Sequence, residues 1–441
     1  MPAHPSDGPR PRTPLIHPAW WVALVSFVVI LGAAAFTAAP GILVDPLHAD
    51  LGWSRAEIGV GLSVQMVLYG LTAPFAAALM DRFGIRPVVA VALCVVAAGA
   101  LATRWMSQPW QFTLCWGALI GLGSGAMALA FTATVTARWF VKRRGLVSGV
   151  LTAATASGQL VFLPVLAWAV EHHGWRSVSL IVTGACLLVL PLVLTLLRDH
   201  PADVGVAPYG ESTLVPKPAP VTGAATRTLA VLWRAVRTGP FWLLAGAFAI
   251  CGATTNGLVR NNFVPAAHDH GMPMTLAASL LAVIGVMDVV GTIFSGWLTD
   301  RFSPRVLLAV YYALRGVSLV FLPMLMGPSI QPPMVFFIIF YGLDWVATVP
   351  PTLALTREVY GEDSPIVFGW VLASHQVGAG LVTYVAGLVR DHTGSYDPVW
   401  FGAGVLCALA AMLSIIIPGQ QRDSAPGDAA PEPSRPATRP A

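Results

Sequence analysis

The feature that most constrains the fold is a series of twelve long apolar runs that recur along almost the whole chain. A helix needs about 20 mostly apolar residues to cross the roughly 30 Å hydrocarbon core of a bilayer, and each run is long enough. Charged residues make up only 10% of the chain, against about 25% in an ordinary soluble domain, so lipid is the expected solvent. We therefore predict an all-α membrane protein with twelve transmembrane helices. The runs cover 20–44, 57–80, 86–106, 111–137, 146–170, 176–197, 240–264, 275–299, 305–326, 332–355, 365–389 and 398–417.

Polar segments divide these runs into two sets of six. The longest interior polar stretch, 198–239, is predicted to be a linker between an N-terminal six-helix bundle at 19–197 and a C-terminal six-helix bundle at 240–417. The flanking segments 1–18 and 418–441 are rich in proline and polar residues. Such segments cannot bury enough apolar surface to fold, so both are expected to be disordered.

The positions of lysine and arginine predict the orientation of the helices, because cytoplasmic loops carry the excess of positive charge. If the N-terminus is cytoplasmic, 19 of the 25 lysines and arginines fall on the cytoplasmic side and four on the outer side, while two lie within runs. Both termini and the linker are therefore predicted to be cytoplasmic. The outer residues are Arg55, Arg104, Arg176 and Arg390.

An internal repeat relates the two halves. Segment 81–86 (DRFGIR) recurs at 300–305 (DRFSPR), an offset of 219 residues, and one further residue carries 172–174 (HHG) onto 392–394 (HTG). A register that is kept from the first loop to the fifth indicates a duplicated six-helix unit, with the two copies parallel in the membrane. In transporters of this architecture the substrate site lies at the interface of the halves. The offset of 219 also matches Pro46 with Pro265, Asp50 with Asp269, Gly52 with Gly271 and Arg138 with Arg357.

With these features the sequence resembles the major facilitator superfamily over nearly its whole length. Segment 79–87 (LMDRFGIRP) is similar to the signature loop of that family, and the second copy keeps the leading glycine, Gly296, where the first has Ala77. The resemblance implies a cytoplasmic gate, in which an aspartate accepts hydrogen bonds from a helix N-terminus and arginines pair across the loop. The gate residues expected from it are Asp81, Arg82, Arg86, Asp300, Arg301 and Arg305.

A narrower resemblance, to the monocarboxylate transporters and the oxalate/formate antiporters, lies at the start of the fifth run. Segment 138–146 (RWFVKRRGL), followed by 157–159 (SGQ), is similar to the entrance of the fifth helix in those carriers. In the monocarboxylate transporters the eighth helix pairs an aspartate with an arginine four residues later. Here Asp288 occupies the first position, but the second is Thr292. The cation that would hold a carboxylate is absent from its usual position, so the substrate class does not follow from the resemblance alone.

Four ionisable residues are expected near the middle of the membrane, all in the C-terminal half. A charge at that depth costs about 2.5–3.5 kcal/mol on insertion scales and therefore requires a role. At about 1.5 Å per residue, Asp288, Arg315, Asp344 and His375 lie at a similar depth in four different runs. Asp288 and His375 are the candidate proton carriers. Arg315 and Asp344 form either a structural ion pair between adjacent helices or a part of the substrate site.

The expected substrate site combines His375, as a switchable positive charge, with hydrogen-bonding side chains from both halves. The alternative for His375 is a histidine that is satisfied by helix packing. Arg260 lies near the predicted outer end of its run, and we expect it either to snorkel to the interface or to attract anions to the outer mouth. The hydrogen-bonding candidates are Gln376, Gln159, Tyr69 and Asn256.

These observations favour a secondary transporter that works by alternating access on a small organic anion, such as a monocarboxylate, with proton coupling left open. The alternative is an efflux carrier for an apolar or aromatic compound. We do not expect an enzyme, because the chain lacks HExxH, GxSxG and GxxxxGK[ST] motifs. The five cysteines have no metal-ligand spacing, so no metal or cofactor is expected. The expected location is the plasma membrane, with a small solute and lipid as partners, no nucleic acid and no obligate protein partner.

Overall fold

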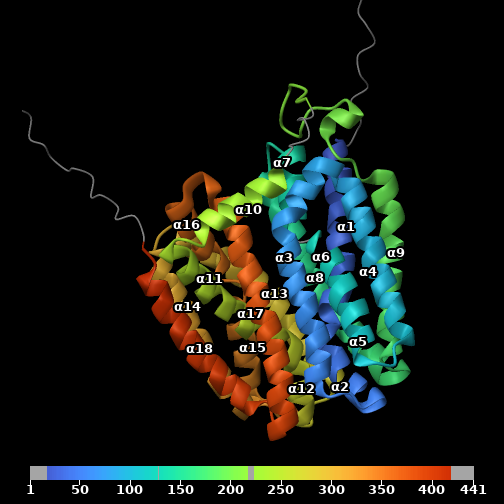
Figure 1. Ribbon diagram of the computed structural model, residues 1–441, viewed down its shortest axis with the longest axis vertical. Coiled ribbons are helices and arrows are strands. Elements are labelled where there is room, and N and C mark those ends of the chain that lie inside the picture. The colour runs from blue at the N-terminus through green and yellow to red at the C-terminus, as the bar shows by residue number, and fades with distance from the viewer. Residues whose placement is uncertain (1–16, 128, 217–222, 419–441) are drawn as a thin grey trace, which may run out of the picture.

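The computed structural model describes residues 17–127, 129–216 and 223–418, and these are almost entirely helical (Figure 1). The segments 1–18 and 418–441, for which disorder is predicted, lie outside the described residues except for residues 17, 18 and 418.

The N-terminal bundle consists of α1 (Pro18–Ala38), α2 (Pro40–Leu51), α3 (Arg55–Phe83), α4 (Ile85–Ala102), η1 (Thr103–Trp105), α5 (Pro109–Phe112), the π-helical η2 (Thr113–Ile120), α6 (Gly121–Gly125), α7 (Leu129–Trp139), α8 (Arg144–His173) and α9 (Arg176–Leu196). Helix α3 begins at a reciprocal cap, in which Ser54 Oγ accepts from Glu57 N at 3.1 Å and Glu57 Oε2 accepts from Ser54 N at 2.8 Å. It ends at Gly84, whose φ of 93° lies in the left-handed region that favours glycine. The signature loop 81–86 is therefore a tight turn between two helices.

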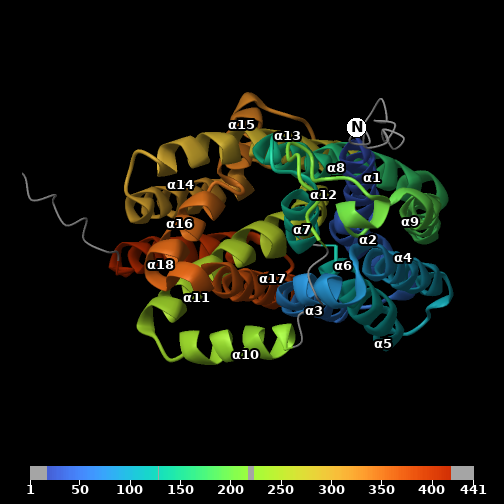
Figure 2. The same cartoon turned by 90° about the horizontal axis from the view of Figure 1, so that it is seen from above.

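The linker and the C-terminal bundle consist of η3 (Pro201–Val204), α10 (Ala224–Ala235), α11 (Gly239–Gly252), the π-helical η4 (Ala253–Arg260), α12 (Asn261–Asp269), α13 (Met274–Thr299), α14 (Pro304–Leu325), α15 (Pro332–Asp344), α16 (Val349–Tyr360), η5 (Gly361–Asp363), α17 (Ser364–Thr393) and α18 (Asp397–Ile416). Helices α11, η4 and α12 follow one another without a break, so the helical run continues to Asp269. Figure 2 shows the two bundles side by side, with α10 along the edge of the C-terminal one.

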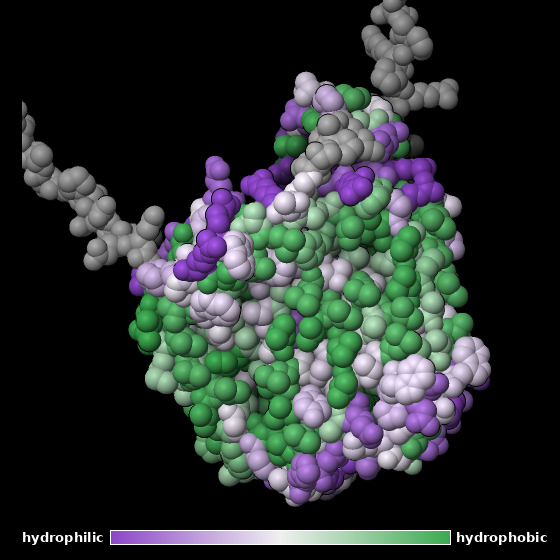
Figure 3. Space-filling model, in the orientation of Figure 1, coloured by the Kyte–Doolittle hydropathy of each residue, from purple (hydrophilic) through white to green (hydrophobic). Residues whose placement is uncertain are grey.

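The two ends of the molecule differ in what they carry (Figure 1). The end with α7, α10 and the linker is called the linker end below, and the end with α2 and α12 is called the distal end. A broad hydrophobic band lies between them on the surface, with hydrophilic residues gathered at both ends (Figure 3). This distribution is what a lipid-facing flank with two wetted ends requires.

Ten helices or continuous helical runs of the described chain are long and apolar enough to cross a membrane, which is the pattern of a multi-pass helical membrane protein. One of them, Pro332–Thr393, is 62 residues long and contains α15, α16 and α17. The predicted run 111–137 is divided among α5, η2, α6 and α7, on either side of residue 128. The number of twelve spans and the cytoplasmic position of the termini therefore stay predictions.

The bundles touch through α3 against α17 and α8 against α13, and glycines set how closely they approach. A Cβ added at Gly59 would lie 3.2 Å from the carbonyl oxygen of Thr383, and one added at Gly387 would lie 2.6 Å from that of Arg55. Both contacts belong to the distal half. Toward the linker end, a Cβ at Gly149 or Gly296 would meet nothing within 4 Å, although Phe75 of α3 still packs on Trp370 of α17 with ring centroids 5.6 Å apart. The bundles are closed together distally and have free space around these linker-end glycines.

The predicted orientation can be tested with two single cysteines in a background in which Cys94 and Cys115 are alanine; the other three cysteines are buried. Ser107 lies exposed in the distal loop between α4 and α5, and Ser212 lies exposed in the linker. A membrane-impermeant maleimide added to intact cells should label Ser107→Cys and should label Ser212→Cys only after permeabilisation. Labelling of both positions, or of neither, in intact cells would contradict a cytoplasmic linker.

Candidate substrate site between the bundles

Arg315 and Asp344 form a buried ion pair inside the C-terminal bundle. Arg315 is fully buried; its Nε donates to Asp344 Oδ2 at 2.6 Å, and one terminal nitrogen donates to the backbone oxygens of Asp344 at 2.6 Å and Trp345 at 3.2 Å. The other terminal nitrogen lies 3.0 Å from Cys251 Sγ. These contacts join α14, α15 and α11, and every partner belongs to the same bundle. The geometry therefore favours the structural role of the two that the sequence left open.

Asp288 on α13 is bound to the interruption between α15 and α16. Its Oδ1 accepts from the backbone N–H of Val346 at 3.0 Å and from Thr292 Oγ1 at 3.2 Å. Thr292, which occupies the position of the expected arginine, thus donates a hydrogen bond to Asp288. The Asp288 carboxylate satisfies a backbone donor that the broken helix leaves free.

His375 and Gln376 are neighbours on α17 but face different helices. The His375 ring packs on Phe248 of α11, with ring centroids 4.8 Å apart, and only 9% of the residue is exposed. Its Nδ1 is buried and has no hydrogen-bond partner among the described residues. Gln376 faces the other bundle, since a Cβ at Gly70 of α3 would lie 2.6 Å from Gln376 Cβ. The His375 ring therefore contacts its own bundle, whereas Gln376 lies at the interface.

The remaining polar candidates come from both bundles. Tyr69 lies on α3, and Gln159 lies on α8 with its Oε1 2.8 Å from where a Cβ on Gly285 of α13 would stand. Asn256 is buried in η4. Tyr69 and Gln159 thus extend the N-terminal wall along the two helices that contact the C-terminal bundle.

Arg260 lies at a different depth from the one that its position in the sequence predicts. It was expected to snorkel near the outer end of a run that ends at 264, but the helix continues to Asp269, so Arg260 lies deeper than predicted. Its backbone oxygen would lie 2.8 Å from a Cβ on Gly41 of the opposite bundle. Its guanidinium lies 5.8 Å from the centre of the Trp345 ring and within electrostatic reach of Tyr69 and Asp288. Arg260 is therefore a partly buried residue at the interface between the bundles, and its distance from the end of the helix does not support interfacial snorkelling.

Arg260 also differs from Arg315 in having no ion pair within the part of the chain that the structure describes. The sequence signal that could have identified it is the repeat, because Pro265 and Asp269 match Pro46 and Asp50 of α2. That match places the end of the seventh run several residues beyond 264.

The first signature loop is bound to its own bundle. Asp81 forms an ion pair with Arg138 of α7 at 2.5 Å, and Arg138 also donates to the backbone oxygens of Met80 and Asp199 at 3.3 Å each. Asp199 in turn accepts from the backbone N–H of Arg86 at 2.7 Å. Arg82 contacts the ring of its neighbour Phe83, 5.1 Å from the centroid. Asp81 and Arg86 are thus fastened within the N-terminal bundle.

The second signature loop lacks this fastening. Arg301 stacks on the Trp297 ring at 3.9 Å, but no ion pair joins Asp300 to Arg357, the match of Arg138, in the described chain. Arg305 lies at the start of α14. The gate predicted at these loops is therefore asymmetric in this conformation.

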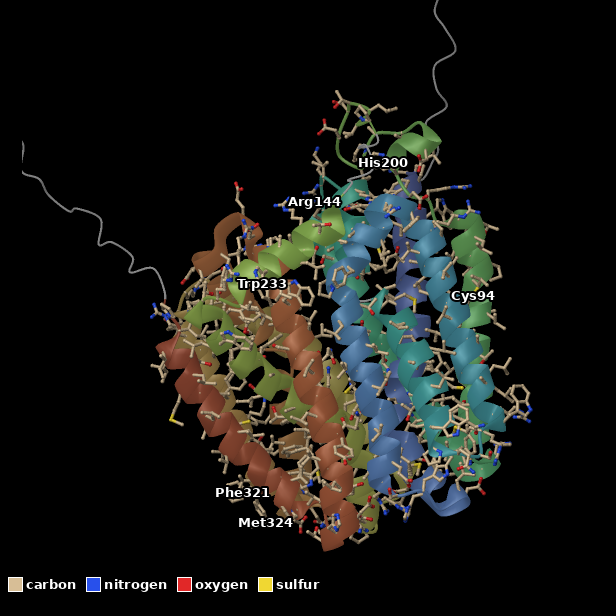
Figure 4. All side chains as sticks on the ribbon, viewed as in Figure 1. Cys94, Arg144, His200, Trp233, Phe321 and Met324 are labelled. Carbon is tan, nitrogen blue, oxygen red and sulfur yellow. The ribbon has the colours of Figure 1, made fainter. Side chains whose placement is uncertain are left out.

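Segment 138–146 forms the turn from α7 to α8, and the linker packs on it. Tyr209 N donates to Trp139 O at 2.8 Å, and Arg144 Nε donates to Phe140 O. Figure 4 shows Arg144 and His200 at this end of the molecule. Among the described residues no three His, Cys, Asp or Glu side chains come together as a metal site would require.

Comparison with known proteins decides the family. The family profile described as Major Facilitator Superfamily matches residues 22–346 and 254–440. The chain belongs to the Major Facilitator Superfamily. It is therefore a multi-pass membrane transporter and not an enzyme.

Relatives of this transporter include proteins of both bacteria and animals. It is 26% identical over 407 residues to the uncharacterized MFS-type transporter YcxA of Bacillus subtilis (strain 168), covering 90% of this chain and 94% of that protein. It is 28% identical over 370 residues to monocarboxylate transporter 13 of Bos taurus, covering 81% and 79%. The inward-open conformation of the xylose transporter XylE from E. coli matches the fold with a TM-score of 0.69 at 14% identity, covering 92% and 98%. The predicted superfamily and the predicted resemblance to monocarboxylate transporters are confirmed.

The buried pair of this transporter predicts a separation of stability from transport. Asp344→Asn should lower the free energy of unfolding by about 3–5 kcal/mol, because it leaves the Arg315 charge buried without a counter-charge. Asp288→Asn keeps an acceptor for Val346 N and should cost about 1 kcal/mol or less. Thermal unfolding of the purified protein in one detergent measures both. Equal stability of Asp344→Asn and the parent chain would refute the structural role of the pair.

Proposed function

We propose that this transporter carries a small organic anion of the monocarboxylate type by alternating access, with Arg260 as the positive charge that receives the carboxylate. The observation that supports this most directly is the contrast between Arg315, which is fully buried, and Arg260, which is partly buried at the interface. Arg315 has a carboxylate at 2.6 Å, whereas Arg260 has no ion pair in the described chain. An unpaired guanidinium in low dielectric is costly, and a substrate carboxylate bound in its two-pronged geometry would remove that cost.

The position of Arg260 suits a carrier as well as a binding site. Its backbone oxygen would lie 2.8 Å from a Cβ on Gly41 of the opposite bundle, and its guanidinium interacts electrostatically with Tyr69 of that bundle. An anion on Arg260 can therefore accept a hydrogen bond from the Tyr69 hydroxyl across the interface, with Gln159, Gln376 and Asn256 as further polar contacts. A substrate that contacts both bundles binds the two conformations with different free energies. This difference in binding free energy is what alternating access requires.

Charge balance supports proton coupling at the same place. Arg260 and Asp288 lie within electrostatic reach of one another, so the empty site contains one positive and one negative group. A bound anion adds one negative charge, and a proton taken up by Asp288 or by His375 restores the balance. We propose Asp288 as the first acceptor, because His375 packs against Phe248. The carrier acts in the plasma membrane, with the solute and lipid as its partners.

The alternative, an efflux carrier for an apolar or aromatic compound, gives Arg260 no role. A neutral apolar substrate would fill the interface and leave the guanidinium without a hydrogen-bonded carboxylate, which low dielectric penalises. The aromatic groups near the site, Trp345 and Tyr69, are compatible with either substrate class. The anion is therefore the proposal that uses the unpaired charge.

Uptake into proteoliposomes of a panel of labelled carboxylates, each paired with the alcohol of the same carbon skeleton, tests the substrate class. Arg260→Gln should lower carboxylate uptake by about 10–100-fold, as expected from the loss of charge-assisted hydrogen bonds worth about 1.5–3 kcal/mol, and Arg260→Lys should retain part of it. Arg104→Gln, a cation at the distal end, is the matched control and should be near normal. Native carboxylate uptake by Arg260→Gln, or uptake of alcohols in preference to carboxylates, would contradict the proposal.

A second measurement concerns the coupling groups. With an imposed pH gradient, Asp288→Asn should remove the pH dependence of uptake, whereas Thr292→Ala, which removes only the 3.2 Å hydrogen bond to Asp288, should have a small effect. His375 is the other proton carrier that the sequence predicts. Loss of pH dependence in His375→Ala, with Asp288→Asn still responsive to the gradient, would move the proton to α17.

A further inference from the structure

Glu171 joins the two bundles at the distal end. It lies in the last turn of α8, and its carboxylate accepts from the backbone N–H of Thr275 at 2.9 Å and from the Thr275 hydroxyl. Thr275 is the second residue of α13, in the other bundle. The carboxylate therefore caps the N-terminus of a helix that belongs to the other bundle.

Asp391 makes a matching contact in the opposite direction. It lies in the last turn of α17, and its two oxygens accept from the backbone N–H groups of Arg55 at 3.1 Å and Ala56 at 2.8 Å. Arg55 and Ala56 are the first residues of α3. The C-terminal bundle thus caps a helix of the N-terminal bundle.

The internal repeat identifies the two contacts as one contact made twice. The offset of 220 that matches segments 172–174 and 392–394 carries Glu171 onto Asp391, and the offset of 219 carries Ala56 onto Thr275. Two acids that match in the repeat therefore cap two helix N-termini that also match in the repeat. Neither acid belongs to the signature loops or to the central site.

We propose that Glu171 and Asp391 are a pair of latches that hold the distal end closed and release when that end opens. Each latch joins the two bundles, so its energy is present only while the distal ends of α8 and α13, and of α17 and α3, remain together. An interaction present in one of two conformations shifts the equilibrium toward that conformation. The close contacts at Gly59 and Gly387 lie at the same end, on the two helices that the Asp391 latch joins.

Other ionic groups at the distal end mostly pair within one bundle and should not sense the opening. Asp50 pairs with Arg176 at 2.9 Å, and Asp269 pairs with Arg390 at 2.6 Å. The exception is His268, which lies 3.4 Å from Asp45 of the other bundle and is half exposed. Asp50 is the matched control for the latches, because it is an acid at the same end whose partners belong to its own bundle.

The experiment measures the distal separation by electron–electron double resonance in nanodiscs. Spin labels are placed at the exposed distal residues Ser107 and Ser329, in the background lacking Cys94 and Cys115. Glu171→Gln and Asp391→Asn should each raise the ratio of open to closed distal ends by about fivefold, in line with a carboxylate at a helix N-terminus, and the double variant by about 25-fold if the latches act independently. Asp50→Asn should leave the ratio within about twofold.

The conservative variant Asp391→Glu separates charge from fold, because it keeps the carboxylate and should stay near the parent ratio. An unchanged ratio in the double variant, or an equal rise in Asp50→Asn, would overturn the latches. The latches act without substrate, so an unchanged distal separation would contradict them and leave the anion proposal standing. Native carboxylate uptake by Arg260→Gln would contradict the anion proposal and leave the latches standing.

Discussion

The low dielectric of the membrane interior is the constraint on which the rest of this structure depends, because it requires every charge there to have a partner or a function. Arg315 shows the structural solution, in which one carboxylate, two backbone oxygens and a thiol surround a guanidinium and join three helices. Asp288 shows a second solution, since its carboxylate accepts a hydrogen bond from the backbone N–H of Val346, where the helix is interrupted. Arg260 has neither an ion pair nor a backbone partner for its guanidinium among the described residues, and it lies at the interface between the bundles.

The contact between the bundles is unequal along their length, and glycine explains how. At the distal end Gly59 and Gly387 bring α3 and α17 within reach of each other's backbone, so the interface there has no room for a side chain. Toward the linker end, Gly149 and Gly296 meet no atoms within 4 Å. The distal contacts at Gly59 and Gly387 are therefore the ones that an opening of that end would have to break.

Much of this fold could be read from the sequence, because lipid imposes long apolar runs and a duplication leaves repeated loops. The ion pair of Arg315 with Asp344 followed from their depth in adjacent runs. The depth of Arg260 could not be predicted, because the predicted run ends at 264, whereas α12 continues through Pro265 to Asp269. The packing of His375 against Phe248 could not be predicted either, since hydropathy does not determine which face of a buried helix meets which neighbour.

Duplication explains the architecture, whereas the differences between the copies explain the site. The offset of 219 pairs Arg260 with Gly41, and these two residues meet across the interface, with the Arg260 oxygen 2.8 Å from where a Gly41 Cβ would lie. One copy contributes the charge and the other contributes the space that lets its backbone approach. A second arginine at position 41 would set two like charges against each other in low dielectric, and a second glycine at 260 would leave no charge for an anion. The place of Arg260 at the contact between the two copies is therefore a consequence of how the copies diverged.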